Sequence, residues 1–86
     1  MIITTTRKFD KKIKKQTIKI QKEFKKRIIL FINDVNCPLL NTHKLSGKLK
    51  HLWSFNISGD IRVVFDKSQK NIIILVDIGT HSDLYS

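Results

Sequence analysis

The N-terminal half of the chain repeats its apolar positions at a helical spacing. The positions recur at steps of three and four residues, at Phe9, Ile13, Thr17, Ile20, Phe24, Ile28, Phe31 and Ile32. This spacing predicts one apolar stripe on a helical segment. Thr17 and Ile18 are poor helix formers, so we expect two helices with a break at residues 16–19. Pro38 biases Cys37 away from helical backbone, so the helical region should end before this pair.

Strand-like patterns occupy the two ends of the chain. β-branched residues suit a pleated surface, and a two-residue alternation of apolar and polar positions is typical of a half-buried strand. The predicted order is a strand within residues 1–6, a polar connection at 39–48, an alternation from Leu49 to Ile57, a turn at 58–60, a second alternation at 61–65, a polar turn at 66–71 and an apolar run at 72–76.

These elements predict an α+β fold of order β-α-α-β-β-β. The last three strands should pair as antiparallel neighbours, and the two helices should pack as a hairpin on one face of a small antiparallel sheet, followed by a short C-terminal tail. No repeat or linker interrupts the pattern, so residues 1–86 are expected to form one domain. A chain of this size has no room for a deep cofactor cavity, so no cofactor is expected and function should use the surface or a shallow groove.

The charge of the chain points to an anionic partner. Seventeen Lys and Arg residues stand against seven Asp and Glu residues, a formal net charge of +10. Such a surface attracts phosphate backbones or acidic proteins. Cys37 has no partner for a disulfide, which fits a reducing compartment. Residues 1–6 are too short for a signal segment, and no apolar window is long enough to span a membrane. We therefore expect a cytoplasmic protein without membrane contact.

His81 is the first candidate for chemistry. It follows Gly79 and Thr80 just beyond the apolar run at 72–76, where a rigid strand would present a side chain near solvent. Histidine transfers protons near neutral pH because its ordinary pKa is about 6.5. On a strongly cationic domain, this residue favours chemistry on a polyanion, and RNA is the polyanion that such groups can cut. The alternative is an incidental surface histidine.

Arg62 is the second candidate. It alternates with Ile61 and Val63, so its side chain should lie on the opposite face of its strand from theirs. A guanidinium group can hold a phosphate through two hydrogen bonds. The alternative is an ion pair with a carboxylate, and the partners considered are Asp60, Asp77 and Asp83.

A second basic cluster precedes the Trp53 strand and could bind phosphate. Its members are His43, Lys44, Lys48, Lys50 and His51. Only His43 and Lys44 are given possible specific roles, because single lysines are more often solvated than bound. Trp53 and Phe55 lie in phase with Ile57, which favours core positions over base-stacking platforms. The single cysteine and three histidines offer no closely spaced pair, so no metal site is expected.

Four ordered segments resemble the RelE/ParE toxin superfamily, close to its RelE/YafQ branch. They are HKLSGKL at residues 43–49, WSF at 53–55, GDIRVVF at 59–65 and IGTHSDLY at 78–85. The resemblance spans nearly the whole chain. It implies a RelE-like fold and the toxin component of a type II toxin–antitoxin system, a ribosome-dependent endoribonuclease that cleaves mRNA in the ribosomal A site and is held inactive by a cognate antitoxin.

The resemblance also implies roles for particular residues. His81 would be the general acid or base, with His43 and Asp60 as further members of the catalytic set. Arg62 matches a strand arginine that would face the scissile phosphate. Tyr85 matches an aromatic residue at the C-terminal end of the family's pattern, where it would contact RNA.

The chain departs from the family's pattern at Asn56, where YafQ-like proteins carry a further histidine. An amide cannot exchange protons, so the identity of the general base stays open. The implied reaction needs no metal: the RNA 2′-hydroxyl attacks the adjacent phosphate, while Arg62 and Lys44 stabilise the developing charge and His81 transfers a proton. Two alternatives stay open, a ParE-like toxin that binds DNA gyrase without nuclease activity and a degenerate toxin that only binds its antitoxin.

Overall fold

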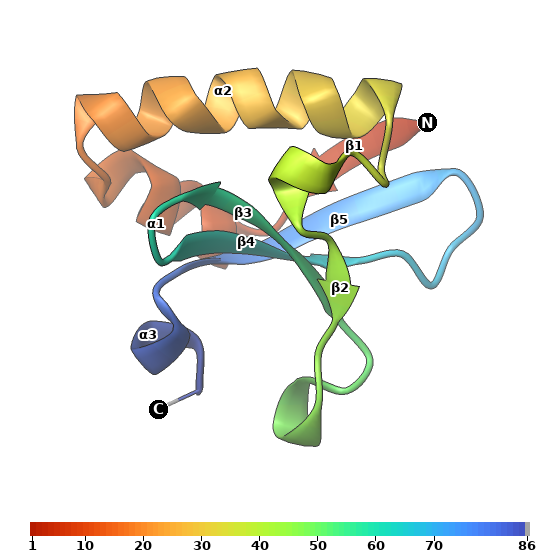
Figure 1. Cartoon of the computed structure of the whole chain (residues 1–86). Helices are drawn as coiled ribbons and strands as arrows, with labels where there is room; N and C mark the ends of the chain where they lie inside the picture. Colours follow the sequence, from red (N-terminus) through yellow and green to blue (C-terminus); the bar gives the residue numbers. More distant parts are fainter. Residues whose placement is uncertain (86) are drawn as a thin grey trace.

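The computed structural model describes residues 1–85, which form a five-stranded sheet with two long helices on one face (Figure 1). The elements are, in order, β1 (Ile2–Thr5), α1 (Arg7–Lys15), α2 (Ile18–Asn33), the 3₁₀ turn η1 (Pro38–Leu40), β2 (His43–Lys44), the 3₁₀ turn η2 (Gly47–Leu49), β3 (Trp53–Ser58), β4 (Ile61–Asp66), β5 (Ile72–Gly79) and α3 (His81–Tyr85). No helix within residues 1–85 is long and apolar enough to cross a membrane.

The predicted break between the two helices is confirmed. Thr6 caps α1 through a hydrogen bond from the Phe9 amide to its side-chain oxygen (3.1 Å), and Thr17 caps α2 in the same way for Ile20 (3.2 Å). Gln16, between the helices, has extended backbone. Thr17 is therefore a helix cap. The predicted stripe joins the core at Phe9, Ile13, Phe24, Ile28 and Phe31, whereas the prediction was wrong for Ile32, which is 49% exposed.

The sheet has the strand order β1-β5-β4-β3-β2. The predicted antiparallel meander of β3, β4 and β5 is confirmed, as is the turn between β3 and β4. The prediction of a wholly antiparallel sheet was wrong, because β1 lies parallel to β5, from Ile2 opposite Ile72 to Thr5 opposite Leu75. The two helices connect β1 to the rest of the sheet as a crossover, and a crossover allows the first strand to run parallel.

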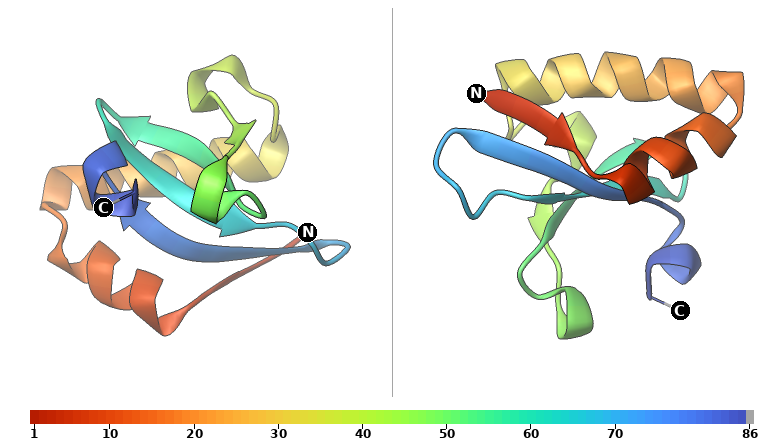
Figure 2. Two further views of the ribbon diagram at one scale, coloured as in Figure 1. Left: turned by 90° about the horizontal axis from the view of Figure 1, so that it is seen from below. Right: turned by 180° about the vertical axis from the view of Figure 1, so that it is seen from behind.

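Two further expectations need correction. The predicted connection at residues 39–48 contains the short strand β2, which pairs with the start of β3. Leu49 and His51 do not belong to the following strand, because η2 and a turn precede Trp53. The C-terminal tail folds into one turn of helix, α3. The η2 turn and α3 lie on the side of the sheet away from α2 (Figures 1 and 2).

Aromatic packing holds α2 against the sheet. The Phe31 ring of α2 lies 4.9 Å from the Phe55 ring of β3 and 5.0 Å from the Phe65 ring of β4, measured between centroids, and all three side chains are fully buried. Phe9 of α1 contacts Phe24 of α2 at 5.5 Å and closes the other end of the core. Phe55 is thus a core residue as predicted, whereas Trp53 is half-buried at the margin.

An ion-pair cluster attaches α1 to the far half of β5. The Asp77 carboxylate accepts a hydrogen bond from the Lys12 ammonium group (2.7 Å) and pairs with Lys8 at 3.2 Å. It also accepts a hydrogen bond from the backbone amide of Ile78, the next residue of β5, at 2.8 Å. Partial burial would raise the pKa of Asp77, but the bonds from Lys12, Ile78 and Lys8 outweigh it, and the pKa is lowered overall. The ionised carboxylate therefore stabilises the folded state.

Replacing Asp77 by asparagine should destabilise the fold in a pH-dependent way. Because the pKa of Asp77 is lower in the folded state, its contribution is present above about pH 4, its ordinary unfolded range, and is lost as the pH falls through the folded value. We expect Asp77→Asn to lower the free energy of unfolding by about 1–2 kcal/mol at pH 7, and by much less near pH 2. Urea denaturation at both pH values measures this.

The control for this prediction is Asp34→Asn, because Asp34 is exposed and accepts only a local bond from the Asn36 amide. It should change stability little at either pH. An equal loss of stability at pH 7 and pH 2 in Asp77→Asn would show that the ion pairs are not the source of its effect.

Candidate active site

Two cross-strand rows of side chains face away from the helices. In one row, Asn56 of β3 lies opposite Arg62 of β4, and Arg62 lies opposite Gly79 of β5. Directly opposed residues of antiparallel strands share a face. Since the neighbouring Phe55 and Val63 pack in the core beneath the helices, this row faces the other side of the sheet. The predicted orientation of Arg62 is confirmed.

The second row runs parallel to the first, two residues away along β4. It joins four residues, His43, Ser54, Val64 and Asp77, from β2 to β5. The two rows form the floor of the face opposite α2. The η2 segment and α3 stand on either side of this floor (Figure 2). The sequence therefore brings His43 and Arg62 to one surface although they lie on different strands.

Three polar atoms on this floor are buried without a hydrogen-bond partner among the described residues. They are the hydroxyl oxygen of Ser54, the amide oxygen of Asn56 and the Nε atom of Arg62. Buried polar atoms are normally paired, and an unpaired one calls for an explanation such as a bound ligand, an ordered water or a role in chemistry. The sequence pattern gave no sign of Ser54, and Asn56 drew notice only through the resemblance.

Arg62 makes one of the ion pairs considered from the sequence. Its Nη2 atom lies 3.0 Å from Asp60 Oδ1, across the turn that begins β4. The Arg62 side chain is 20% exposed and the Asp60 side chain 59% exposed, so the pair is accessible at its outer end. Such exposed pairs contribute little to stability. Asp60 pairs with Arg62, and among the described residues no hydrogen bond or ion pair joins it to His81 or His43.

His81 stands at the start of α3, held by a short cap. The Thr80 hydroxyl accepts the Asp83 amide (3.1 Å), and Asp83 Oδ2 accepts the Thr80 amide (3.0 Å). The hydrogen bond from the Thr80 backbone lowers the pKa of Asp83. The His81 ring is exposed and stacks on the Tyr85 ring, with 4.6 Å between centroids and 29° between planes. Tyr85 therefore packs against the candidate catalytic ring.

His43 has a defined hydrogen bond. Its Nδ1 atom lies 2.8 Å from the carbonyl oxygen of Asn41, and a carbonyl can only accept. The hydrogen of a neutral His43 ring is thus on Nδ1, which leaves the Nε2 lone pair available to take a proton. The ring is half-buried on β2. The arrangement suits a general base better than a general acid.

The predicted basic residues are only partly brought together. One hollow of about 320 Å³ is lined by Lys44, Lys50, His51, Trp53, Lys67 and Ser68. The Lys67 ammonium group lies 3.9 Å from the centroid of the Trp53 ring. Lys48 is exposed on η2 and does not line this hollow. Trp53 shares the face of Phe65, and Lys44 lies opposite Trp53, so these two side chains are on the other side of the sheet from Arg62. Sequence reasoning missed Lys67, a lysine in the turn after β4.

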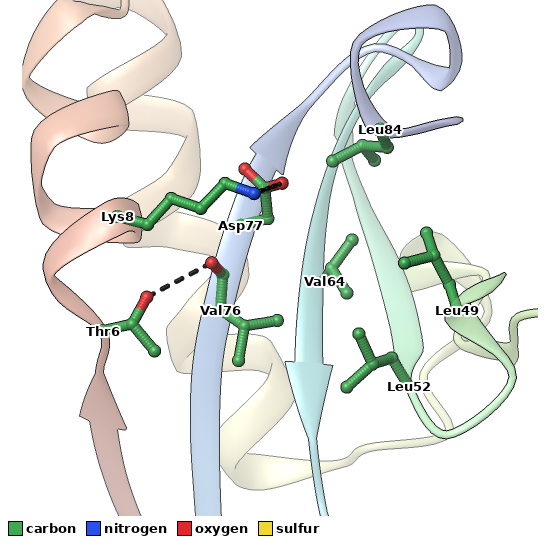
Figure 3. Close-up of a pocket in the computed structure, with 8 residues that line it drawn as sticks. All are labelled: Thr6, Lys8, Leu49, Leu52, Val64, Val76, Asp77 and Leu84. Carbon is green, nitrogen blue, oxygen red and sulfur yellow. Dashed lines mark hydrogen bonds and ion pairs between the residues drawn. The ribbon is translucent and has the colours of Figure 1, made fainter. Parts of the chain in front are cut away.

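An apolar groove adjoins the Arg62 row and was not predicted (Figure 3). Its volume is about 320 Å³, and its lining residues are Thr6, Lys8, Leu49, Leu52, Val64, Val76, Asp77 and Leu84. Figure 3 shows Leu49 and Leu52 on one side, Leu84 of α3 at one end and Val64 on the floor. The sequence feature that could have indicated this groove was Val64, an apolar residue on the same face of its strand as Arg62. Within residues 1–85, no three His, Cys, Asp or Glu side chains cluster as a metal site.

Solved structures share this fold. YafQ from Escherichia coli, solved alone and in complex with DinJ, superposes with TM-scores of 0.77 and 0.76 at 18% sequence identity, covering 98% of this chain and 97% of that chain. A YoeB/ParE toxin from Agrobacterium tumefaciens gives a TM-score of 0.76 at 14% identity, covering 94% of this chain and 99% of that chain. The fold is therefore that of RelE-like toxins.

Sequence similarity identifies the family, whereas the structural similarity identifies the fold. The family described as bacterial toxin of type II toxin–antitoxin system, YafQ, matches residues 1–86. A metal-bound toxin from Helicobacter pylori is 30% identical, with a TM-score of 0.72 and 99% of each chain covered. No curated protein sequence matches the chain. The chain belongs to the YafQ family of type II toxins, which confirms the resemblance seen in its motifs.

The position of α3 depends on the absence of a side chain at Gly79. A Cβ atom added there would lie 2.9 Å from the Cβ of Asp83, closer than such atoms approach. We expect Gly79→Ala to push α3 outward and to disturb the stacking of His81 on Tyr85, at a cost of about 1–3 kcal/mol in stability. The ring proton signals of His81 in an NMR spectrum report the change directly.

Ser82→Ala is the matched control, because Ser82 is exposed in the same helix. It should leave the His81 signals near their original positions. Unchanged His81 signals in Gly79→Ala would mean that the contact with Asp83 does not position α3.

Proposed function

We propose that this toxin is a ribosome-dependent endoribonuclease that cleaves mRNA and so inhibits translation in the cytoplasm. The observation that carries the proposal is the row on the face opposite α2, where Arg62 and Asn56 carry buried, unpaired polar atoms, with His43 toward β2 and His81 beyond the end of β5. An arginine flanked by two proton-transfer groups is suited to an RNA phosphodiester. We treat residues 1–86 as one functional domain.

The proposed reaction uses the RNA 2′-hydroxyl as the nucleophile. His43 Nε2 removes the 2′-hydroxyl proton, the 2′-oxygen attacks the adjacent phosphorus, and the bond to the 5′-oxygen breaks. His81 gives its proton to the departing 5′-oxygen, which leaves a 2′,3′-cyclic phosphate and a 5′-hydroxyl end. Arg62 stabilises the negative charge that develops on the phosphate oxygens. Lys44 shares the face of Trp53 and not that of Arg62, so we assign it only a long-range attraction for the RNA backbone.

The spacing between His43 and His81 supports their assignment as general base and general acid. His43 lies on β2 and His81 follows β5, and these strands are three positions apart in the sheet. At about 4.8 Å per strand, their backbones are roughly 14 Å apart across the sheet. His43 is in line with Asp77, four residues before His81, so the two histidines are also separated along the strands and lie diagonally on either side of Arg62. An in-line displacement needs its base and acid on opposite sides of the phosphorus, and this arrangement provides both sides.

The proposed partners are mRNA on the ribosome and a cognate antitoxin. YafQ from Escherichia coli has been solved in complex with DinJ. For this chain, the net charge of +10 supports association with ribosomal RNA and with an acidic antitoxin segment. In the proposed complex with RNA, Lys48, Lys50, His51 and Tyr85 contribute contacts outside the reacting atoms. The proposed reaction assigns no role to a metal ion or small-molecule cofactor.

His81→Ala and Arg62→Ala should abolish cleavage while the protein still binds ribosomes. Loss of a general acid costs on the order of 10²–10⁴ in rate, and loss of a preorganised phosphate ligand costs on the order of 10²–10³. Mapping mRNA 5′ ends by primer extension in a translating extract measures the effect. Lys25→Ala, an exposed change on α2, should cleave like the wild type. Normal cleavage by His81→Ala would refute its assignment.

The second test concerns the general base. His43→Gln should lower the cleavage rate by about 10² or more, because glutamine cannot accept the 2′-hydroxyl proton. Adding Asn56→His to this variant should restore part of the rate, since Asn56 lies beside Arg62 on the same face and a histidine there can take up a proton. Single-turnover cleavage in the same extract compares the variants. Wild-type rates for His43→Gln would exclude His43 as the base.

The competing functions give different results in these assays. A ParE-like toxin would inhibit DNA gyrase supercoiling equally well with His81→Ala and would leave mRNA intact. A degenerate toxin would cleave no message and inhibit no gyrase, yet would still bind its antitoxin. Either outcome for the wild-type protein would replace the nuclease proposal.

A further inference from the structure

The apolar groove adjoins the place proposed for the scissile phosphate. Its floor residue Val64 lies two positions after Arg62 on β4 and on the same face of the sheet. Two residues along a strand span about 7 Å, close to the distance between successive nucleotides of an extended single strand. Leu84, which closes one end of the groove, belongs to the same short helix as His81. A polymer bound across Arg62 would therefore place its next unit in the groove.

The polar side chains that line the groove are already engaged. The Thr6 hydroxyl donates to the carbonyl oxygen of Val76 (3.2 Å), and Lys8 pairs with Asp77 at 3.2 Å (Figure 3). Asp77 is also bound by Lys12. A ligand in this groove thus meets aliphatic surface from Leu49, Leu52, Val64, Val76 and Leu84. Such a lining selects by size and shape, because it presents no free pattern of donors and acceptors.

Cationic residues surround this apolar surface. Lys48 and Lys50 flank Leu49 and are exposed. At the opposite side of the groove, Lys8 and Lys12 share the single carboxylate of Asp77, so this side also carries net positive charge. A nucleotide unit of a strand combines a flat base, whose two faces are apolar and whose edge is polar, with a phosphate on each side. Its faces match an aliphatic groove, and its phosphates match a cationic margin. An acidic protein segment would match the margin, but the adjoining Arg62 row favours a phosphodiester.

We propose that this groove holds the base of the nucleotide next to the scissile phosphate and selects it by size. The inference rests on the proposed nuclease function and adds a specificity site to it. Leu52 and Leu84 form the walls against which the base packs, and Val64 forms the floor. The affinity of the groove for a base varies by degrees, and it differs between purines and pyrimidines because of their difference in size.

Binding of uncleavable RNA tests the groove directly. The probes are hexa-adenylate and hexauridylate with 2′-O-methyl riboses, which lack the attacking hydroxyl, and the same hexamers with abasic central positions. In NMR spectra of methyl-labelled protein, the methyl signals of Leu49, Leu52, Val64 and Leu84 should shift on adding the intact hexamers. Removing the bases should weaken binding by about tenfold. The methyl groups of Ile29 and Leu39, which are 59% and 64% exposed, should not respond.

A variant that fills the groove provides a second test of the inference. Leu52→Trp should weaken binding of hexa-adenylate at least fivefold, and more than binding of hexauridylate, because purines need more space. The matched control Leu39→Trp should change both affinities less than twofold. Leu49→Ala enlarges the groove and should have the opposite effect, a shift of the relative affinity toward hexa-adenylate. It provides the test if circular dichroism shows that Leu52→Trp does not fold.

Two results would overturn the inference. One is that saturating RNA leaves the groove methyl signals unchanged and that the protein binds the intact and the abasic hexamers with the same affinity. The other is a response of these methyl groups to an acidic helical peptide of Glu and Leu but not to RNA, which would assign the groove to a protein partner. Because these measurements do not require cleavage, a protein that binds bases in the groove but cuts no message would refute only the nuclease proposal.

Discussion

The contact of Phe31 with Phe55 and Phe65 determines which face of the sheet is buried, and the site depends on that choice. Side chains alternate along a strand, so a face that holds Phe65 and Val63 in the core must send Arg62 and Val64 to the other side. A shift of one residue in register would exchange the two sets and bury a guanidinium under α2. The burial of three phenylalanine rings therefore does more than stabilise the fold, because it also orients the candidate catalytic row.

A bulge in β5 completes this row. Val64 pairs with Asp77 and Phe65 pairs with Leu75, so Val76 is an extra residue in the ladder. The bulge resets the alternation: Leu75 and Ile78 both enter the core although they are three residues apart. Asp77 consequently faces α1 and the groove instead of the core, and Gly79 joins the row of Arg62. Bulges commonly re-aim side chains next to functional sites, and this one also sets where α3 begins.

Much of this architecture follows from local sequence, and the rest depends on contacts distant in the chain. The helix break, the β3–β4 turn and the face of Arg62 follow from spacing and turn chemistry, and the structure confirms them. The parallel pairing of β1 with β5 joins residues about seventy positions apart, and no local pattern encodes it. The groove was equally hidden, because Leu49, Leu52, Val64 and Leu84 come from three separate segments. The proposed roles of His81 and His43 still rest on the resemblance and on their placement.

The seven carboxylates of this chain are all engaged within the fold, and this leaves its positive charge largely uncompensated. Asp10, Asp34, Asp66 and Asp83 accept hydrogen bonds from hydroxyl or amide groups. Glu23, Asp60 and Asp77 pair with cations, and among residues 1–85 these ion pairs engage only Lys8, Lys12, Arg27 and Arg62.

Most of the seventeen cationic residues therefore have no anionic partner in the described structure, although each repels the others. A polyanion relieves that repulsion when it binds, and the gain falls as salt screens the charges. Attraction of this kind is spread over the surface and cannot position a phosphate. In the proposed complex this positioning falls to Arg62, whose guanidinium group is held at its outer end by the ion pair with Asp60.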